Sequence, residues 1–319
     1  MNASVSGYDP FVQGPHPVGV RSFEAVDRTR GRVFPCEVWA PADSPGTCPL
    51  LIYSHPSGGG RRAATFLTTH LASHGYVVAA LDHSEMIAPD LARRDGETTG
   101  QKEARWKALM ASRVPDVRFL LDRLIDGAPM DPQAAVDPGR VGIVGHSLGG
   151  WTALASVEVE PRIRSVVALA PGGASRPKPG ILPATLAFAW SRDVPTLYLV
   201  AESDTSLPLS GMYELLERTP AAKRMVILRR ADHMHFMDGA ETLHETVRNM
   251  PPAGELAWLP REMRPIAELC SAEQSHLFAR GLSLAHLDAT LRQHEEARLL
   301  MAGDLRAELA RRGIDAIVP

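Results

Sequence analysis

The stretch Gly145-His146-Ser147-Leu148-Gly149 places one hydroxyl among small residues. It fits the pattern Gly-x-Ser-x-Gly, in which the serine occupies a strained turn between a strand and a helix. The helix N-terminus favours developing negative charge there, and the backbone N–H of Leu148 would donate to an oxyanion. An apolar run precedes the turn and a helix-forming segment follows it, so we predict a catalytic nucleophile at Ser147. The alternative is a glycine-rich turn with an incidental serine.

A serine hydroxyl is a weak nucleophile at neutral pH, and it needs a general base that an acidic residue orients. With this turn, the expected order along the chain is serine, acid, histidine. The segment PTLYLVAESDTSLP carries both Glu202 and Asp204. We predict Asp204 as the acid, because it lies in the loop beyond the strand, with Glu202 as the alternative. The segment RMVILRRADHMHFMDG follows, and we predict His233 as the base, with His235 as the alternative.

The same histidines suggest a second chemistry. His233 and His235 could form a metal site together with Asp232 or Asp238. A His-x-His pair is a weak metal signal, and no second group of ligands occurs elsewhere in the sequence. We therefore expect no metal.

The segment YSHPSGGGRR is a candidate for the other half of an oxyanion hole. Its glycines, residues 58–60, leave the backbone free to face a ligand. Pro56 has no N–H, so Ser57 is the predicted donor. The alternative is a glycine-rich surface turn. We expect His55 to be structural beneath this loop, and we find no partner for His83.

The elements that must position these residues alternate along the chain. Short apolar runs rich in Val, Ile and Leu alternate with helical segments, which is typical of a parallel sheet covered by helices on both faces. In such a sheet the ends of successive strands lie on one edge, which would bring distant residues together. We predict an α/β fold with a mostly parallel, eight-stranded sheet, helical excursions and a helical C-terminal tail.

We treat residues 1–319 as a single domain, because no repeat or low-complexity linker divides them. Residues 1–17 form an N-terminal arm, either a loop or loosely attached. Residues 240–275 form an irregular, proline-rich excursion, and residues 276–319 form C-terminal helices.

Bulk composition narrows the functional classes. The net charge of -3 gives no sign of a nucleic-acid partner, and no apolar run is long enough to span a membrane. The N-terminus does not read as a signal peptide. Three cysteines, Cys36, Cys48 and Cys270, show no paired spacing and fit reduced thiols in the cytoplasm. Formation of a homo-oligomer stays open.

With these residues in place, the sequence resembles the α/β-hydrolase superfamily over nearly its whole length. It looks most like the predicted dienelactone hydrolase group and the platelet-activating-factor acetylhydrolases. The segments that carry the resemblance are GPHPVGVRSFEAVDRTRGRVFPCEVWAPA, YSHPSGGGRRAATFLTTHLASHGYVVAALDHSE, VGIVGHSLGG and ADHMHFMDG. The resemblance implies a Ser–Asp–His hydrolase that acts on carboxylic esters or lactones without a metal or organic cofactor.

The chain departs from these relatives at two places. Dienelactone hydrolase has a cysteine nucleophile where this chain has Ser147. The acetylhydrolases place their acid directly after the sixth strand, where this chain reads VVALAPGGAS without a carboxylate, so the acid must come from Asp204 on the next strand end.

The predicted reaction is cleavage of a small-molecule carboxylic ester through an acyl-enzyme. Acyl transfer, or thioester or amide cleavage, would use the same residues, and a non-catalytic scaffold is a third alternative. The sequence leaves two alternatives for the large side chains near the predicted site, which could either cap the pocket or belong to the core. These are Met86, Trp106, Leu186, Phe188, Trp190, Met234 and Phe236.

Overall fold

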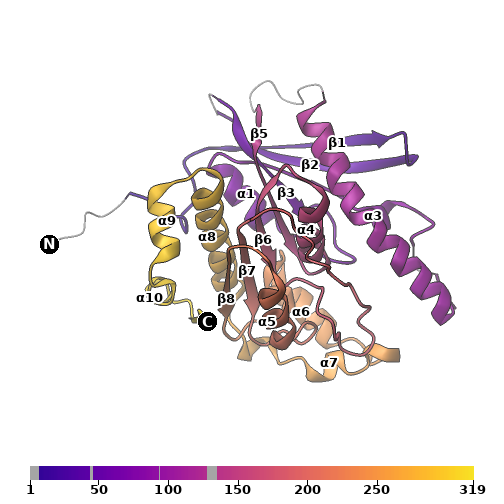
Figure 1. The fold of residues 1–319 in the computed structure, drawn as a ribbon. Helices are drawn as coiled ribbons and strands as arrows, with labels where there is room; N and C mark the ends of the chain where they lie inside the picture. Colours follow the sequence, from indigo (N-terminus) through magenta and orange to yellow (C-terminus); the bar gives the residue numbers. More distant parts are fainter. Residues whose placement is uncertain (1–6, 44–45, 93, 128–134) are drawn as a thin grey trace.

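A computed structural model describes residues 7–43, 46–92, 94–127 and 135–319 (Figure 1). These residues form one sheet of nine strands in the spatial order β1-β2-β4-β3-β5-β6-β7-β8-β9. β1, β2 and β9 pair antiparallel with their neighbours, and β3 to β8 pair in parallel. The strands are β1 (Val18–Asp27), β2 (Arg32–Pro41), β3 (Cys48–Ser54), β4 (Val77–Leu81), β5 (Val136–His146), β6 (Ile163–Leu169), β7 (Thr196–Ala201), β8 (Lys223–Leu228) and β9 (Ala316–Ile317).

The α/β class and the mostly parallel sheet are confirmed, but the sheet has one strand more than the predicted eight. The additional strand is β9, which pairs with the edge strand β8 through Ala316 and Ile317. A strand of two residues gives no periodicity from which it could be read.

Helices cover both faces of the sheet and form a core on each (Figure 1). β3, β4 and β7 consist entirely of buried residues, as expected for strands covered on both faces. On one face lie α1 (Thr65–Ser73), α8 (Ala272–Leu291) and α10 (Leu305–Ala310). On the other lie α3 (Thr99–Ile125), α4 (Leu148–Val159) and α5 (Leu209–Arg218). The sheet thus forms a rigid support whose strand ends can carry a site.

The described part of the N-terminal arm is anchored, and the idea that it is loosely attached is wrong. Phe11 is buried in the core beside α8. The Tyr8 hydroxyl donates to Asp288 at 3.0 Å, and Arg312 pairs with Asp9 at 2.9 Å. A buried ring, one hydrogen bond and one ion pair therefore attach the arm to the C-terminal helices.

The C-terminal third contains the predicted excursion and helices. The excursion holds α6 (Ala240–Arg248), η2 (Gly254–Leu256), α7 (Leu259–Glu262) and η3 (Ile266–Glu268). α8 begins at Ala272 rather than at residue 276, because Ser271 and Gln274 form a capping box at its start. α9 (Glu295–Ala302) and α10 follow it.

Two further observations concern the described residues as a group. None of their helices has the length and apolar character needed to cross a lipid bilayer. Cys36, Cys48 and Cys270 are all buried, and Cys36 and Cys270 are free thiols. Burial raises the pKa of Cys36 to about 12 and that of Cys270 to about 11, so these thiols stay protonated.

Candidate active site

Ser147 lies at the sharp junction between β5 and α4. Its backbone has φ 57° and ψ −118°, a conformation that residues with a side chain rarely adopt. Flanking glycines allow the turn: a Cβ on Gly145 would lie 2.1 Å from the Gly149 carbonyl oxygen, and one on Gly149 would lie 1.9 Å from that of Ser54. The Gly-x-Ser-x-Gly spacing is therefore a steric requirement of this turn.

Two backbone amides lie beside this serine. Ser57 and Leu148 line the same pocket as Ser147. Leu148 is the first residue of α4, where amides lack a partner within the helix. Neither amide donates a hydrogen bond to any residue that the structure describes. In the part of the chain that the structure describes, both predicted donors are therefore unpaired and belong to residues of the pocket that contains Ser147, as an oxyanion hole requires.

Asp204 lies in the loop that follows β7, as predicted. Its side chain is almost fully buried, and Oδ1 accepts hydrogen bonds from the amides of Ser206 at 2.9 Å and Leu207 at 2.7 Å. The second oxygen, Oδ2, lies 2.7 Å from Nδ1 of His233. The loop thus fixes the carboxylate so that one oxygen faces the histidine.

His233 is the first residue of η1 (His233–Phe236), directly after Asp232. Asp232 caps this turn, because its Oδ1 accepts from the His233 amide at 2.6 Å. The same carboxylate accepts from the Thr205 amide at 2.8 Å and from the Thr205 hydroxyl at 2.9 Å. Asp232 thereby links the turn of the histidine to the loop of Asp204. This linking role was missed in the sequence, although an aspartate before a short helix is a recognisable capping signal.

The His233–Asp204 pair has the electrostatics of a general base. Burial of the ring opposes protonation, but the neighbouring Asp204 carboxylate outweighs it and raises the pKa of His233 above the ordinary 6.5. With Nδ1–H donating to Asp204, Nε2 is left to accept a proton. Ser147 and His233 line the same pocket, and within the described residues no hydrogen bond joins their side chains. Such catalytic hydrogen bonds often tighten only when substrate is bound.

The alternative residues have other partners. Glu202 pairs with Arg229 at 3.2 Å and accepts from the Arg230 amide at 3.1 Å, which anchors the loop after β7. His235 accepts from the Asp232 amide at Nδ1 and lies 3.0 Å from the Cys270 carbonyl at Nε2. Both ring nitrogens of His235 are therefore occupied by the backbone.

The residues of the metal cluster that was considered and not favoured from the sequence have other contacts. Asp238 accepts from the amides of Thr65 at 2.7 Å and Phe66 at 3.1 Å, and so caps α1. Across the described residues, no group of three or more His, Cys, Asp and Glu side chains could hold a metal ion.

His146, within the turn, packs against the candidate base. Its ring centroid lies 4.7 Å from that of His233 and 5.8 Å from that of Phe236. Complete burial, together with the charge of His233, holds the pKa of His146 well below 6.5. A neutral ring therefore forms one wall behind His233. This contact could not be predicted from the sequence, in which only the position of His146 beside the serine points to it.

The pocket that contains Ser147 and His233 has a volume of about 1100 Å³. Its lining includes residues of α5, α6 and α7, and these helices gather at the carboxyl edge of the sheet (Figure 1). Its apolar lining comes from Met86, Leu91, Trp106, Leu109, Ile181, Leu182, Ala184, Leu207, Met212, Val247, Met250, Leu256 and Leu259. Charged side chains such as Arg105, Glu97, Lys102 and Glu255 also line it and pair with one another.

The large residues left open in the sequence divide between pocket and core. Met86 and Trp106 line the pocket, and Trp106 Nε1 donates to the Pro183 carbonyl at 2.7 Å. Leu186 and Phe188 are instead buried in the core with α4 and α5, and Phe236 is buried on the other face. Leu186, Phe188, Trp190, Met234 and Phe236 are not among the pocket-lining residues of the described chain. The described C-terminal helices α8 to α10 contribute no lining residue either.

Comparison with known proteins agrees with this architecture. The family model for "PETase: PET hydrolase-like" matches residues 36–265, which include the turn of Ser147, the loop of Asp204 and His233. A ferulic acid esterase from Streptomyces cinnamoneus superposes with a TM-score of 0.63 at 23% identity, covering 87% of this chain and 91% of that one. The fold and the site define an α/β-hydrolase. The chain belongs to the PET hydrolase-like family.

Curated relatives match over different lengths. A bis(hydroxyethyl) terephthalate hydrolase from Streptomyces coelicolor is 22% identical over 78% of this chain and 68% of its own. Cutinase est1 from Thermobifida alba is 25% identical over 56% of this chain, which spans about half of that cutinase. A platelet-activating factor acetylhydrolase from Cavia porcellus is 26% identical over 39% of this chain and 35% of its own. The predicted relationship to ester hydrolases, and to the acetylhydrolases among them, is confirmed.

Proposed function

We propose that this protein is a serine esterase that cleaves carboxylic esters through an acyl-enzyme. The observation that carries the proposal is the buried His233–Asp204 hydrogen bond of 2.7 Å at a pocket that also contains the strained Ser147. In the proposed reaction, His233 Nε2 takes the hydroxyl proton while Ser147 Oγ bonds to the ester carbonyl carbon. The amides of Leu148 and Ser57 hold the oxyanion.

Collapse of this tetrahedral species breaks the bond to the leaving alcohol, which receives the proton from His233. Water then attacks the acyl-enzyme with His233 again as base, which releases the acid and restores Ser147. Asp204 keeps Nδ1 protonated and stabilises the positive ring. All parts of the cycle lie on the 319 residues, which we propose act as one catalytic domain, and the cycle uses no cofactor.

The pocket supports an ester with a bulky, mostly apolar acyl or alcohol group. A volume of about 1100 Å³ lies at the upper end of the range for small-molecule sites, and its walls are largely aliphatic and aromatic. Two tryptophans hold the walls together, because Trp106 donates to the Pro183 carbonyl and Trp258 to the Pro179 carbonyl. The named relatives include hydrolases of aromatic esters, which makes bis(hydroxyethyl) terephthalate a suitable first substrate to test.

A fluorophosphonate probe tests the reaction directly. We expect one equivalent of probe to attach, and peptide mapping to place it on Ser147. Steady-state assays with p-nitrophenyl esters of rising chain length, bis(hydroxyethyl) terephthalate and a few lactones then define the substrate, and added alcohols or amines separate hydrolysis from acyl transfer. Labelling at another serine, or no labelling together with no ester turnover, would refute the proposal.

The pocket assignment has its own test. Trp106→Ala removes an apolar part of the pocket wall and leaves the proposed catalytic residues in place. Because only large groups would contact this wall, we expect a raised KM for long-chain and aromatic esters and little change for the acetate. Tyr213→Ala, on an exposed side chain outside the pocket, is the matched control. Equal effects on all chain lengths would contradict the assignment.

We also propose a cytoplasmic location, which the buried free thiols of Cys36 and Cys270 support. Cell fractionation with activity assays tests this. Activity found only outside the cytoplasm would refute it.

A further inference from the structure

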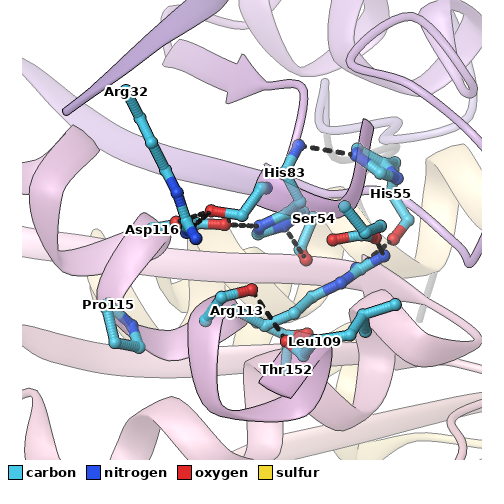
Figure 2. Close-up of polar contacts among 12 residues, drawn as sticks. Arg32, Ser54, His55, His83, Leu109, Arg113, Pro115, Asp116 and Thr152 are labelled. Carbon is cyan, nitrogen blue, oxygen red and sulfur yellow. Dashed lines mark hydrogen bonds and ion pairs between the residues drawn. The ribbon is translucent and has the colours of Figure 1, made fainter. Parts of the chain in front are cut away.

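A buried arginine holds the loop that carries the second oxyanion donor. Arg113, on α3, has no exposed surface. Its Nη1 donates to the His55 carbonyl at 2.6 Å, and Nη2 makes a longer contact of 3.5 Å with the Pro56 carbonyl. Figure 2 shows the guanidinium reaching from α3 toward the backbone at His55. The planar fork of one side chain thus ends on two consecutive carbonyls of this loop.

The geometry of one peptide unit links these carbonyls to the site. The Pro56 carbonyl and the Ser57 amide belong to the same peptide unit, and none of the described peptide bonds is cis. In a trans peptide the C=O and N–H point in opposite directions. Holding the Pro56 oxygen on one side therefore turns the Ser57 N–H to the other.

Three donors hold that oxygen. The Pro56 carbonyl accepts from His55 Nδ1 at 2.7 Å and from the Gly59 amide at 3.1 Å, in addition to Arg113. His55 can donate at Nδ1 because its Nε2 accepts from the His83 amide at 3.0 Å. Of these donors, Arg113 and His55 are fully buried, whereas Ser57 lines the pocket that contains Ser147.

The arginine is itself held in place by acidic groups. Nη2 of Arg113 pairs with the Glu85 carboxylate, whose side chain is only 6% exposed. Asp116, one turn further along α3, accepts from the Ser84 amide at 2.8 Å and from its hydroxyl at 2.7 Å. These two hydrogen bonds join α2 (Ser84–Ile87) to α3. A buried ion pair adds little net stability compared with apolar residues, so orientation is the effect to look for.

We propose that Arg113 is a positioning residue for transition-state stabilisation: by gripping the carbonyls of His55 and Pro56, it aims the Ser57 amide at the oxyanion. The inference rests on the proposed esterase function. It predicts that weakening the grip lowers binding of the oxyanion without a matching loss of binding of the neutral carbonyl.

Arg113→Lys tests the proposal, because lysine keeps the charge beside Glu85 but lacks the fork that reaches two carbonyls. Arg192→Lys is the matched control. Arg192 also holds backbone carbonyls, those of Val157 at 2.9 Å, Glu160 at 3.0 Å and Ile163 at 2.8 Å, but outside the pocket. Both variants are assayed for p-nitrophenyl butyrate turnover, for thermal unfolding, and for affinity toward a trifluoromethyl ketone and the methyl ketone of the same shape.

We expect Arg113→Lys to lower kcat/KM about ten- to hundred-fold, part of what removal of an oxyanion donor costs. Affinity for the trifluoromethyl ketone, which forms an oxyanion with the serine, should fall by the same factor. Affinity for the methyl ketone and all values for Arg192→Lys should stay near wild type. Glu85→Gln weakens the hold on the arginine and serves if Arg113→Lys does not fold. It should show smaller losses of kcat/KM and of trifluoromethyl ketone affinity, with methyl ketone affinity near wild type.

Other outcomes overturn the proposal. Unchanged kcat/KM in a folded Arg113→Lys, equal losses for the two ketones, or equal losses in Arg113→Lys and Arg192→Lys would reduce Arg113 to a structural residue. If Arg113→Lys does not fold, an unchanged kcat/KM in Glu85→Gln would likewise show that Arg113 is only a structural residue. If the wild-type protein fails to bind the trifluoromethyl ketone and Ser147→Ala is as active as wild type, it is the proposed acyl-enzyme at Ser147 that fails; if the wild-type protein turns over no ester, it is the esterase function that fails.

Discussion

Two sets of serine, histidine and aspartate occur on this sheet, and the more completely bonded one is sealed in the interior. Ser54 Oγ lies 2.8 Å from His83 Nε2, and His83 Nδ1 lies 3.2 Å from Asp116 (Figure 2). At the pocket, His233 is hydrogen-bonded to Asp204 at 2.7 Å. Within the described residues, no hydrogen bond joins the side chains of Ser147 and His233. Hydrogen bonds alone would therefore select the buried set and not the set that we propose to be catalytic.

The surroundings separate the two. Ser54, His83 and Asp116 are at most 1% exposed, and none lines the pocket that contains Ser147. Burial and the charge of Arg113 lower the pKa of His83, whereas Asp204 raises the pKa of His233. Ester cleavage by a serine therefore needs a strained turn, unpaired amides and access for the substrate as much as it needs the three side chains.

The largest expected difference concerns the two serines. Ser147→Ala removes the proposed nucleophile, so kcat for p-nitrophenyl butyrate should fall about a million-fold. Ser54→Ala removes only the hydrogen bond to His83, so we expect turnover within about tenfold of wild type and a free energy of unfolding lower by about 1–3 kcal/mol. Steady-state kinetics and denaturant unfolding of both variants measure this. Similar losses of turnover in the two would erase the distinction.

The two aspartates should differ in kind. Asp204→Asn keeps an oxygen for the amides of Ser206 and Leu207 but no longer fixes the tautomer of His233, so kcat should fall about ten-thousand-fold. Asp116→Asn removes the buried carboxylate that pairs with Arg30 and accepts from Ser84, while Arg30 keeps its pair with Asp27, so the loss of stability should be about 1–3 kcal/mol. Its turnover at a temperature where it is folded should exceed that of Asp204→Asn by at least about a hundredfold. A stable Asp116→Asn, or an active Asp204→Asn, would break the assignment.

Ser147, Asp204 and His233 could be predicted from the sequence as candidates because the constraints on their positions are local. Gly145 and Gly149 are required by steric contacts within one turn, so the motif marks Ser147 directly. Parallel strands put their ends on one edge, which limits the acid and base to the short loops after β7 and β8. Within those loops, Asp204 and His233 were the predicted residues, and they are the ones that meet.

The buried set could not be found in the same way. Asp116 lies inside a long helix, and its spacing to Ser54 and His83 carries no pattern, because only the packing of α3 on the sheet brings them together. The roles of Phe188 and Trp106 could not be separated either. An aromatic residue is equally suited to the core or to a pocket wall, and only the path of the chain decides between them.

A smaller effect should appear in the pH profile. Catalysis needs neutral His233, and the neutral fraction falls as pH drops through a pKa that Asp204 raises above 6.5. The acid limb of kcat/KM should therefore lie above pH 6.5 in the wild-type enzyme, and it should move to lower pH in the residual activity of Asp204→Asn. His83, whose pKa is lowered, should contribute nothing to this limb. A limb that stays in place in Asp204→Asn would show that another group controls it.

The smallest expected effect sharpens the choice of acid at the pocket. Glu202 lies just before Asp204 in the same loop, but its carboxylate pairs with Arg229 on a partly exposed surface. Exposed ion pairs contribute about 0–1 kcal/mol, so Glu202→Gln should keep kcat within about threefold of wild type and leave the acid limb unmoved. Kinetics of Glu202→Gln beside Asp204→Asn, across the same pH range, make the measurement. If Glu202→Gln instead lost activity to the extent of Asp204→Asn, the orientation of His233 would depend on the whole loop, and the hydrogen bond between His233 and Asp204 would not suffice to tell the working set from the buried one.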